Sequence, residues 1–474
     1  MVFLGRTKKI HFVGIGGIGM SGIAELLLNY GFVVTGSDMK DSDNVRRLRE
    51  LGAEIGIGHH GGQISGADVV VYSSAVDETN PEIAAALATG IPVIPRAEML
   101  GELMRLKFAI TVGGSHGKTS TTSLVASVMA HGGLDPTVVV GGKLKAAHSN
   151  ALLGTGRYMV AEADESDGSF IRLPSSIAVI TNIDAEHLDF YGDLDAVKHG
   201  FVAYANRVPF YGAVILCADD KNVHDIMPEI NRRKITYSLE GAGLAPGTTG
   251  ADLRGEIVSR EGQGTRFSVE YLDEPLGEIT LGIPGTHYVS NALAACAVGM
   301  EMDIPFYAIK KGIECFEGVG RRFEVKGTEA GVIVVDDYGH HPTEIAATVK
   351  AAVDNYNRPL IVMFQPHRYS RTQAVADRFA TCFHGAKDVY VTDIYPAGER
   401  PIPGIDARTI IDRVEASGGP KVHYADSFES MTDQVAKLAR DGDMVMTMGA
   451  GDIYKAGEML LDKLSGKRKS KKDA

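Results

Sequence analysis

The sequence predicts an α/β protein of three domains, each built on a mainly parallel β-sheet with helices on both faces. Short apolar runs alternate with helical stretches along most of the 474 residues, and strands buried on both faces of a parallel sheet have this continuous apolar character. Two of the runs end in glycine-rich turns that open a helix, as in doubly wound nucleotide-binding domains. The length agrees with about three domains of ordinary size.

Each expected strand is a short, continuously apolar segment. These segments are residues 10–15, 68–73, 108–112, 158–161, 177–183, 332–335, 360–364, 388–392 and 444–448. Residues 250–282 differ, because short alternating segments are separated by turns that contain glycine, and this pattern predicts antiparallel strands late in the second domain. After a glycine-flanked segment at residues 318–327 the strand–helix alternation starts again. We therefore predict domains at residues 1–107, 108–321 and 322–474.

Composition limits the class of protein. The chain carries 48 Lys and Arg against 60 Asp and Glu, a formal net charge of −12, which argues against a broad nucleic-acid-binding surface because a phosphate backbone requires clustered basic residues. The four cysteines include no CxxC pair, so neither a zinc knuckle nor a redox motif is indicated. Neither a signal-like segment nor an apolar stretch of membrane-spanning length is found. We expect a cytoplasmic protein without a membrane span, as a monomer or a homodimer.

The first glycine-rich turn follows the strand expected at residues 10–15 and opens a helix. Its central residues are Gly16, Gly17, Ile18 and Gly19. Glycines allow close approach of the backbone, and a helix N-terminus presents free amides and partial positive charge to a diphosphate. Asp38 ends the next strand, where an acidic residue often binds a ribose hydroxyl. The turn predicts a nucleotide-diphosphate site, and it fits NAD and a UDP-sugar equally.

The second glycine-rich turn lies between the strand expected at residues 108–112 and a helix. Its residues are Gly114, Ser115, His116, Gly117, Lys118, Thr119 and Ser120. Backbone amides of such a turn surround the β- and γ-phosphates, Lys118 supplies a positive charge, and the Thr119 hydroxyl suits Mg²⁺. The GxxxxGK[ST] spacing would need glycine at position 112, which is Val112. The turn is therefore a shorter variant, and it predicts ATP and Mg²⁺ as cofactors.

This second turn resembles the ATP loop of the Mur ligase superfamily, and further segments match motifs of that family in order. They are residues 161–167 (AEADESD), 181–192 (TNIDAEHLDFYG), 285–295 (GTHYVSNALAA), 320–324 (GRRFE), 336–344 (DDYGHHPTE) and 365–372 (QPHRYSRT). The resemblance covers essentially the whole chain, and the set is most similar to the family member that adds L-alanine. Tyr288 departs from the pattern, because the family usually has asparagine there.

The resemblance implies a Rossmann-like UDP-binding first domain, a central P-loop ATPase-type domain and a Rossmann-like C-terminal domain that binds the amino acid. It also implies ATP-dependent ligation of L-alanine to the lactyl carboxylate of UDP-N-acetylmuramate, through an acyl phosphate, with release of ADP and phosphate in peptidoglycan precursor synthesis. The lactyl carboxylate and ATP are both anions, so the site must neutralise charge and position the reacting groups.

Roles for the metal- and nucleotide-binding residues also follow from the resemblance. The residues expected to bind Mg²⁺ are Thr119, Glu162 and His187, and those expected at the transferred phosphate are Lys118 and Arg321. His287 and Asn291 are expected near the adenine. One of Asp336 and Asp337 is expected at the ribose, with a slight preference for Asp337. We expect Asp164 and Glu165 to be helix-capping or salt-bridged acids, and Arg322 to be structural. Some relatives carry a carbamylated lysine between two metal ions, but no lysine after His187 matches its register, so none is assigned.

The two remaining groups of residues are expected at the sugar and at the amino acid. Ser166 and Asp167 are expected to face the sugar or its lactyl group. His367, Arg368 and Arg371 form a basic cluster, and a guanidinium can hold a carboxylate through two hydrogen bonds. The resemblance therefore implies that one of the two arginines binds the alanine carboxylate.

Three other functions compete with this interpretation. A relative that joins murein tripeptide to the same UDP-sugar shares the first turn and the His-His-Pro motif, although residues 365–372 favour the single-alanine enzyme. A nicotinamide-dependent dehydrogenase would explain the first turn but not the second turn, Glu162 or His187. A regulatory P-loop ATPase would need neither the first turn nor the basic cluster. A folylpolyglutamate synthetase is disfavoured, because the first turn would have no purpose in it.

Overall fold

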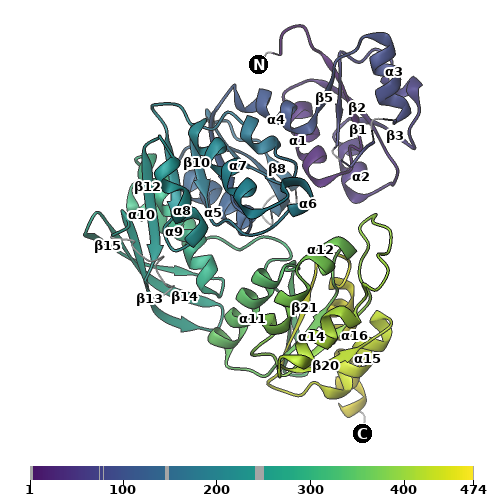
Figure 1. Ribbon diagram of the computed structural model, residues 1–474, viewed down its shortest axis with the longest axis vertical. Helices are drawn as coiled ribbons and strands as arrows, with labels where there is room; N and C mark the ends of the chain where they lie inside the picture. The colour runs from purple at the N-terminus through teal and green to yellow at the C-terminus, as the bar shows by residue number, and fades with distance from the viewer. Residues whose placement is uncertain (1–3, 74, 78, 145–148, 241–249, 473–474) are drawn as a thin grey trace. The chain divides into compact units, whose positions relative to one another are not determined.

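The computed structural model describes residues 4–73, 75–77, 79–144, 149–240 and 250–472. Three β-sheets succeed one another along the chain (Figure 1), with five, ten and six strands. The predicted α/β class with three sheet domains is thereby confirmed. Each continuously apolar segment expected from the sequence is a strand, with ends that shift by a few residues.

The first sheet is wholly parallel and has the order β3-β2-β1-β4-β5. Its strands are β1 (Lys9–Val13), β2 (Val33–Asp38), β3 (Glu54–Ile57), β4 (Val69–Tyr72) and β5 (Val93–Pro95). Its helices are α1 (Ile18–Asn29), α2 (Asp43–Glu50), η1 (Gly61–Ile64), α3 (Pro81–Thr89) and α4 (Arg96–Met104). The strand order reverses direction between β1 and β4, the place where doubly wound sheets bind their ligands. The first glycine-rich turn leaves β1 at this place.

The second sheet contains the central part of the chain and has the order β15-β14-β13-β12-β11-β10-β6-β9-β7-β8. Its strands are β6 (Phe108–Gly113), β7 (Thr137–Leu144), β8 (Ser149–Leu152), β9 (Tyr158–Glu162), β10 (Ile177–Ile180), β11 (Ala213–Cys217), β12 (Lys234–Leu239), β13 (Leu253–Glu261), β14 (Gly264–Tyr271) and β15 (Glu274–Leu281). Its helical segments are α5 (Lys118–His131), η2 (Ser169–Arg172), α6 (Leu188–Tyr191), α7 (Leu194–Asn206), α8 (Lys221–Ile226), η3 (Met227–Glu229), α9 (Thr286–Glu301) and α10 (Phe306–Glu314). Strand β6, which leads into the second glycine-rich turn, pairs in parallel with β9 and β10.

The antiparallel insertion expected at residues 250–282 is present as β13, β14 and β15, which are neighbours in the sheet. Their connections hold two residues each, Gly262 with Gln263 and Leu272 with Asp273, and only antiparallel strands can be joined by so short a turn. Gly262, Leu272 and Asp273 all have positive φ angles, as tight hairpin turns require. The alternating sequence pattern therefore identified this region correctly.

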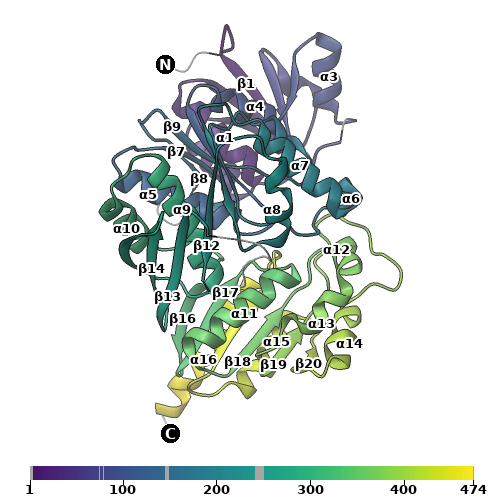
Figure 2. The same ribbon diagram turned by 60° about the vertical axis from the view of Figure 1, so that its left-hand side comes forward.

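The third sheet has the order β16-β17-β21-β18-β19-β20, with only β16 antiparallel to its neighbour. Its strands are β16 (Glu324–Glu329), β17 (Val332–Asp337), β18 (Leu360–Phe364), β19 (Asp388–Val391), β20 (Lys421–Tyr424) and β21 (Met444–Met448). Its helices are α11 (Pro342–Tyr356), α12 (Tyr369–Ala374), η4 (Ala376–Arg378), α13 (Phe379–Cys382), α14 (Arg408–Ala416), α15 (Phe428–Leu438) and α16 (Tyr454–Lys472). Figure 2 shows this sheet with its helices from a second direction.

The apolar core of the first sheet continues into the central one. One cluster of buried side chains runs from Ile10 and Phe12 to Phe201 and Leu216, and a separate cluster fills the third domain. The chain accordingly divides into two compact units, of which the first holds residues 4–256 and the second residues 317–472, with the intervening segments shared between them. The three sheets suggest three domains, whereas the contacts within the chain give two compact units. The domain limits at residues 107 and 321 therefore stay predictions.

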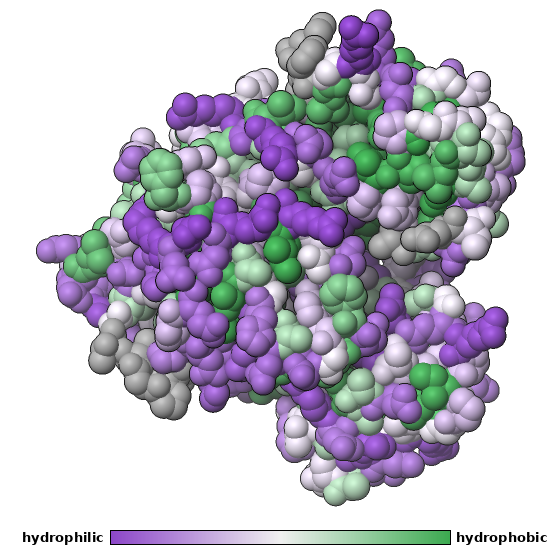
Figure 3. Space-filling model, turned by 45° about the horizontal axis from the view of Figure 1, so that its top comes forward, coloured by the Kyte–Doolittle hydropathy of each residue, from purple (hydrophilic) through white to green (hydrophobic). Residues whose placement is uncertain are grey.

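Hydrophilic side chains cover most of the face shown in Figure 3, with hydrophobic ones in small groups between them. Within the described ranges, none of the helices combines the length and the apolar character needed to cross a lipid bilayer.

Candidate active site

The first glycine-rich turn, residues 14–19, is held from behind by the end of β2. The backbone amides of Gly14 and Ile15 donate to the carbonyl oxygen of Ser37 at 2.9 and 3.0 Å. The amide of Gly16 donates to Asp38 Oδ2 at 2.9 Å. A Cβ atom at Gly16 would lie 2.9 Å from that carboxylate oxygen, so this position requires glycine. Asp38 was expected at a ribose; the structure places its carboxylate on the turn itself, and the ribose role stays a prediction.

Helix α1 begins directly after Gly17, and no side chain caps its N-terminus. The first amides of an uncapped helix are free to bind a ligand, and the helix dipole favours an anion there. Gly17, Ile18 and Gly19 line a cavity at this helix end. The structure therefore brings three of the predicted substrate-binding residues together at the uncapped N-terminus of α1, and their contact with the substrate stays a prediction.

The second glycine-rich turn, residues 113–119, is held by residues that follow β10. The amide of His116 donates to Asn182 Oδ1 at 2.8 Å, and the Thr181 hydroxyl donates to the His116 carbonyl at 2.7 Å. The amide of Asp184 donates to Ser115 Oγ at 2.8 Å. Gly114 has a φ angle of 133°, and a Cβ atom there would collide with the Thr181 hydroxyl. The structure therefore contains the turn that the sequence predicted. The conformation of this turn depends on residues 181–184, which are distant in the sequence.

The side chain of Asn291, in α9, lies against the same turn. Gly117 has a φ angle of 79°, and a Cβ atom there would lie 2.8 Å from Asn291 Oδ1. The side chain of Asn291 is buried. Its position beside the turn agrees with an expected place near the nucleotide, whereas the contact with adenine stays a prediction. Ser120 is buried in the first turn of α5.

Lys118 is bound to a buried carboxylate. Its Nζ lies 2.9 and 2.8 Å from the two oxygens of Glu165, and it also donates to the Gly114 carbonyl at 2.7 Å. Glu165 is 1% exposed. Burial alone lowers the pKa of Lys118, but the charges of Glu165 and Asp164 outweigh it and raise that pKa above its ordinary value. Glu165 was expected to be salt-bridged, which is confirmed, but the sequence did not identify the loop lysine as its partner.

Glu162 ends β9 with one carboxylate oxygen unsatisfied. Oε1 is buried and has no hydrogen-bond partner among the described residues. Burial raises the pKa of Glu162, while the Thr119 side chain and the Gly141 amide oppose this. A buried carboxylate without enough donors favours a cation, and Mg²⁺ prefers carboxylate and hydroxyl oxygens. Glu162 and Thr119 therefore fit the predicted metal, and they are the residues that would hold it.

His187 lies beside the Lys118–Glu165 pair. Its Nε2 is 3.9 Å from Glu165 Oε1 and 3.5 Å from Glu186 Oε2. The residue has a positive φ of 55° directly before α6. This places it at the nucleotide loop, as the motif suggested, while its metal ligation stays a prediction. The two lysines that follow it, Lys198 and Lys221, both donate to Asp225.

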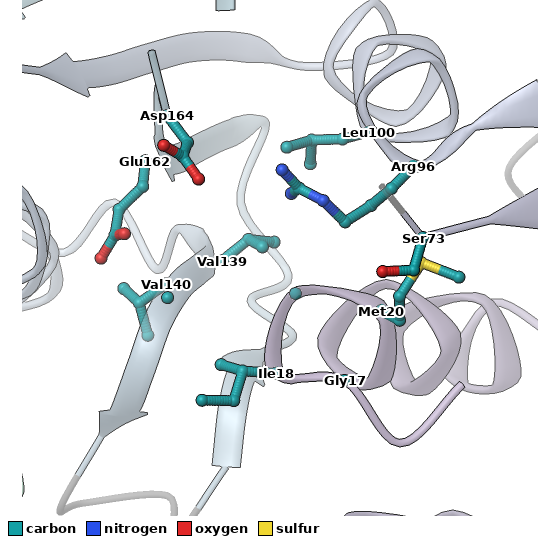
Figure 4. Close-up of a pocket in the computed structure, with 12 residues that line it drawn as sticks. Gly17, Ile18, Met20, Ser73, Arg96, Leu100, Val139, Val140, Glu162 and Asp164 are labelled. Atoms are coloured by element: carbon teal, nitrogen blue, oxygen red, sulfur yellow. The ribbon is translucent and has the colours of Figure 1, made fainter. Parts of the chain in front are cut away.

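A cavity of about 270 Å³ connects the first turn with two carboxylates, Glu162 at the end of β9 and Asp164 just after it. Figure 4 shows Gly17 and Ile18 on one side of it, and Glu162 and Asp164 on the other. Arg96, the first residue of α4, points into this space toward Asp164. Burial raises the pKa of Asp164, but Lys118, the Ser166 amide and Arg96 outweigh it and hold the pKa below its ordinary value.

Arg96 is a site residue that the sequence did not reveal. It follows a strand of three residues and belongs to no motif, so only the fold shows that it lies opposite the first turn. The expected sugar-binding residues Ser166 and Asp167 form the turn after Asp164, in which the Ser166 amide donates to Asp164 Oδ1 at 3.1 Å. Asp167 accepts from the Ser169 amide at 2.9 Å. Their contact with the sugar stays a prediction.

Arg321 is bound within the third domain. Its guanidinium donates to Asp336 Oδ2 at 2.9 Å, and to the carbonyls of Gly451 and Gly449 at 2.9 and 2.7 Å. It also lies over the rings of Tyr338 and Tyr454. In this conformation Arg321 connects the ends of β17 and β21, and none of its described contacts points to a phosphate site. The phosphate role therefore stays a prediction.

Arg322, expected to be structural, contacts Glu344 Oε1 at 3.3 Å and lies over the ring of Tyr338. Asp337 is 3% exposed, and its two oxygens accept from the amides of Phe323 at 2.8 Å and Gly339 at 2.7 Å. Burial raises the pKa of Asp337 to about 6, against the charge of Arg322. In this conformation both carboxylate oxygens of Asp337 bind backbone amides. The ribose contact stays a prediction.

His287 lies in the first turn of α9, with Nδ1 buried and without a hydrogen-bond partner among the described residues. Burial, assisted by the charge of Arg322, lowers the pKa of His287 to about 4. The ring is therefore neutral at pH 7. This agrees with an expected place near the adenine without testing it.

The basic cluster predicted after β18 is present. Arg371 Nη1 lies 3.1 Å from His367 Nδ1, and the His367 ring stacks on Tyr395. Burial and the charges of Arg371 and Arg368 lower the pKa of His367 to about 4. Arg368 is exposed, and its Nε lies 4.0 Å from Glu399 Oε1. The cluster therefore presents two arginines beside a neutral histidine.

Comparison with known proteins places this arrangement in a family. Three family models match in order: "Mur ligase family, catalytic domain" at residues 9–108, "Mur ligase middle domain" at residues 112–299, and "Mur ligase, glutamate ligase domain" at residues 321–451. The UDP-N-acetylmuramate–L-alanine ligase of Geotalea uraniireducens is 52% identical over 98% of this chain and 99% of its own. The enzyme of the same name from Desulfatibacillum aliphaticivorans is 53% identical over 96% and 98%.

Solved structures give the same result. The UDP-N-acetylmuramate–alanine ligase of Thermotoga maritima is similar with a TM-score of 0.80 and 27% identity, over 97% of this chain and 99% of that one. A murein peptide ligase from Psychrobacter arcticus shares the fold with a TM-score of 0.70, at 23% identity over 97% and 99%. Because the family models match in order from residue 9 to residue 451 and full-length relatives exceed half identity, this chain belongs to the Mur ligase family.

Proposed function

We propose that this chain joins L-alanine to the lactyl carboxylate of UDP-N-acetylmuramate with ATP, in the cytoplasm, as a step of peptidoglycan precursor synthesis. The observation that supports this most directly is the cavity of Figure 4. It has the first anion-binding turn at one end and the carboxylate beside the ATP loop at the other. A UDP-sugar whose diphosphate lies on the first turn can direct its sugar-linked carboxylate toward the second. The relatives that share more than half of their residues carry this activity in their names.

The reaction has two steps. The lactyl carboxylate attacks the γ-phosphate of ATP and becomes an acyl phosphate, and ADP leaves. The amine of L-alanine then attacks the acyl carbon, phosphate leaves, and the nitrogen loses a proton. Lys118 holds the phosphates, and Arg96 neutralises anionic charge in the cavity. Mg²⁺ on Thr119 and Glu162 would supply further neutralisation of the phosphate charge.

The test is release of phosphate from ATP with UDP-N-acetylmuramate, compared for L-alanine, murein tripeptide and no amine. Release that needs both the sugar and L-alanine is the expected result. Release with tripeptide alone would identify the recycling ligase instead. Binding of NADH without any release would favour a dehydrogenase. The second glycine-rich turn argues against that alternative, because a dehydrogenase needs no second nucleotide loop.

The basic cluster supports a proposal for the alanine site. Arg371 and Arg368 are the candidates for its carboxylate, and the direct contact of Arg371 with His367 favours Arg371. Arg371→Ala should raise the KM for L-alanine about 10- to 100-fold, since a hydrogen bond to a charged group contributes about 1.5–3 kcal/mol. The KM for ATP should change less than twofold. Arg413→Ala is the control, because Arg413 pairs with the exposed Asp377 in the same domain. Equal changes of both KM values would contradict the assignment.

A further inference from the structure

A fully buried carboxylate lies in the first domain, away from the cavity. Glu82, in the first turn of α3, is 0% exposed. Its Oε2 lies 2.7 Å from His11 Nε2 and accepts from the Ser37 hydroxyl at 2.8 Å. Its Oε1 lies 3.1 Å from His59 Nδ1. We name Glu82, His11, His59 and Ser37 the Glu82 cluster.

The Glu82 cluster joins four elements. His11 lies in β1, Ser37 in β2, His59 after β3, and Glu82 in α3. The second ring nitrogen of His11 contacts the Thr35 hydroxyl at 2.8 Å, and His59 Nδ1 also lies 2.9 Å from Ser37 Oγ. A buried carboxylate is tolerated only when its oxygens are satisfied, and here both oxygens have partners. Such a network fixes the geometry of its members closely, since moving one leaves the others unpaired.

The cluster is connected to the first glycine-rich turn through Ser37. The carbonyl of Ser37 receives the amides of Gly14 and Ile15, and the next residue, Asp38, receives the amide of Gly16. Three consecutive amides of the turn thus depend on the position of residues 37 and 38. From the other side, a Cβ atom at Gly14 would lie 3.3 Å from Val76 Cγ2, so the turn has little room to move away. The side chain of Ser37 is in turn fixed by Glu82.

We propose that Glu82 is a positioning residue, which acts with His11 and His59 through Ser37 to set the first glycine-rich turn for the diphosphate of the UDP-sugar. This inference rests on the proposed function. Glu82 touches neither substrate nor reacting atoms. Its effect is to hold the anion-binding amides in register, because binding sites lose affinity when their supporting residues loosen.

The experiment measures binding of UDP-N-acetylmuramate to the full chain by calorimetry, with a non-hydrolysable ATP analogue as the second ligand. Glu82→Ala should raise the Kd for the UDP-sugar about 10-fold or more, because the buried His11 and Ser37 and the partly buried His59 lose their common partner. The Kd for the ATP analogue should change less than twofold. Glu82→Gln should restore UDP-sugar binding to within about threefold, because it keeps the length of the side chain and His59 can offer an unprotonated nitrogen to its amide.

Two further variants separate positioning from general destabilisation. Glu25→Ala is the matched control, because Glu25 is a buried carboxylate of the same domain that pairs with Arg47 at 2.8 Å. It should lower the melting temperature without changing either Kd. Ser37→Ala keeps the carbonyl and removes the hydroxyl that Glu82 binds, so it should raise the Kd for the UDP-sugar several-fold even if Glu82→Ala does not fold.

Unchanged UDP-sugar binding in folded Glu82→Ala or in Ser37→Ala would overturn the inference, as would equal weakening of both ligands. A wild-type chain that binds the ATP analogue but no UDP-sugar would instead overturn the proposed function. The two failures are therefore distinguishable.

Discussion

The two glycine-rich turns of this chain follow parallel strands and open helices, yet they are supported in different ways. The first turn carries no charged side chain of its own; its amides rest on the Ser37 carbonyl and the Asp38 carboxylate. The second turn carries Lys118, whose charge is compensated by the buried Glu165. The first is therefore a site shaped by its backbone, whereas the second is a site with an internal counterion.

The two turns therefore offer different groups to an incoming ligand. A diphosphate at the first turn meets the free amides of α1, whose N-terminus has no side-chain cap. A triphosphate at the second turn meets a lysine that already holds an anion, so phosphate oxygens must replace the Glu165 carboxylate. We infer that binding at the first site depends on the positions of the backbone amides. Binding at the second site depends on replacement of the Glu165 carboxylate by phosphate oxygens.

Removal of Lys118 should have the largest effect and should separate the two sites. Lys118→Ala should lower kcat/KM for ATP about 1,000-fold, in the range seen when a charged group aimed at a developing anion is lost. The Kd for UDP-N-acetylmuramate should remain within twofold. Steady-state phosphate release and calorimetry measure these values.

Loss of Lys118 also leaves Glu165 buried without a cation, which destabilises the fold. The double variant Lys118→Ala with Glu165→Gln removes both charges and serves as the control for folding. Recovery of activity in the double variant would show that instability, and not the missing charge, had caused the loss.

A methyl group in the first turn should have the next largest effect, on the other ligand. In Gly16→Ala the new Cβ atom meets Asp38, Ser42 and Val45 at 2.9 Å. The Kd for the UDP-sugar should rise about 10- to 100-fold, since overpacking costs about 1–3 kcal/mol. Gly62→Ala, whose Cβ atom would meet nothing nearer than 3.7 Å, is the control in the same domain. Weaker binding of ATP analogue by Gly16→Ala would mean that the turns are not independent.

Glu165→Gln tests the counterion directly and should have a smaller effect. It removes the negative charge that phosphate must replace, so the ATP analogue should bind about 3- to 10-fold more tightly, as expected when a like charge is removed from an anion site. Asp195→Asn removes an exposed charge from α7 and should change nothing. Weaker binding by Glu165→Gln would reverse the comparison, because Glu165 would then orient Lys118 for the phosphate.

The smallest effect should be the pH dependence of the first turn's support. Burial raises the pKa of Glu82, but hydrogen bonds from His11 and Ser37 outweigh it and hold the pKa below the ordinary 4.5. An acid with a lowered pKa contributes stability above its ordinary value and loses it as the pH falls through the folded value. The melting temperature of wild type should exceed that of Glu82→Gln by a constant few degrees from pH 7 to pH 5, and less below pH 4.5. If the difference in melting temperature between wild type and Glu82→Gln grew as the pH fell, the lowered pKa of Glu82 would be contradicted.

The positions of both turns could be predicted because their requirements are local. Gly16, Gly114 and Gly117 stand where a side chain would collide or where φ is positive, and the sequence shows this as glycine between an apolar run and a helix. The antiparallel hairpins of β13, β14 and β15 were predictable for the same reason, since alternation and short turns are local patterns.

The supports of the turns were not predictable, because they come from distant segments. Glu165 is 47 residues from Lys118, and Glu82 is 45 residues from Ser37. Arg96 belongs to no motif and reaches the cavity only because α4 begins beside α1. Motifs also do not show the direction of neighbouring side chains. Of the pair Arg321 and Arg322, the sequence favoured the first for phosphate, and it did not show that the Arg321 guanidinium donates to the Gly449 carbonyl after β21; the phosphate role stays a prediction.

The strand order of the third sheet determines when this domain can fold during synthesis of the chain. Strand β21 lies between β17 and β18 and pairs with both, although it is the last strand to be synthesised. The Gly449 and Gly451 carbonyls that bind Arg321 follow it. The first sheet can close on the ribosome once Pro95 has emerged, and N-terminal domains generally fold first. A nascent chain that stops before Met444 carries a finished N-terminal domain and two open strand edges, which favour aggregation. Interrupted translation products of this protein should therefore depend on chaperones or be degraded, even though only their final segment is missing.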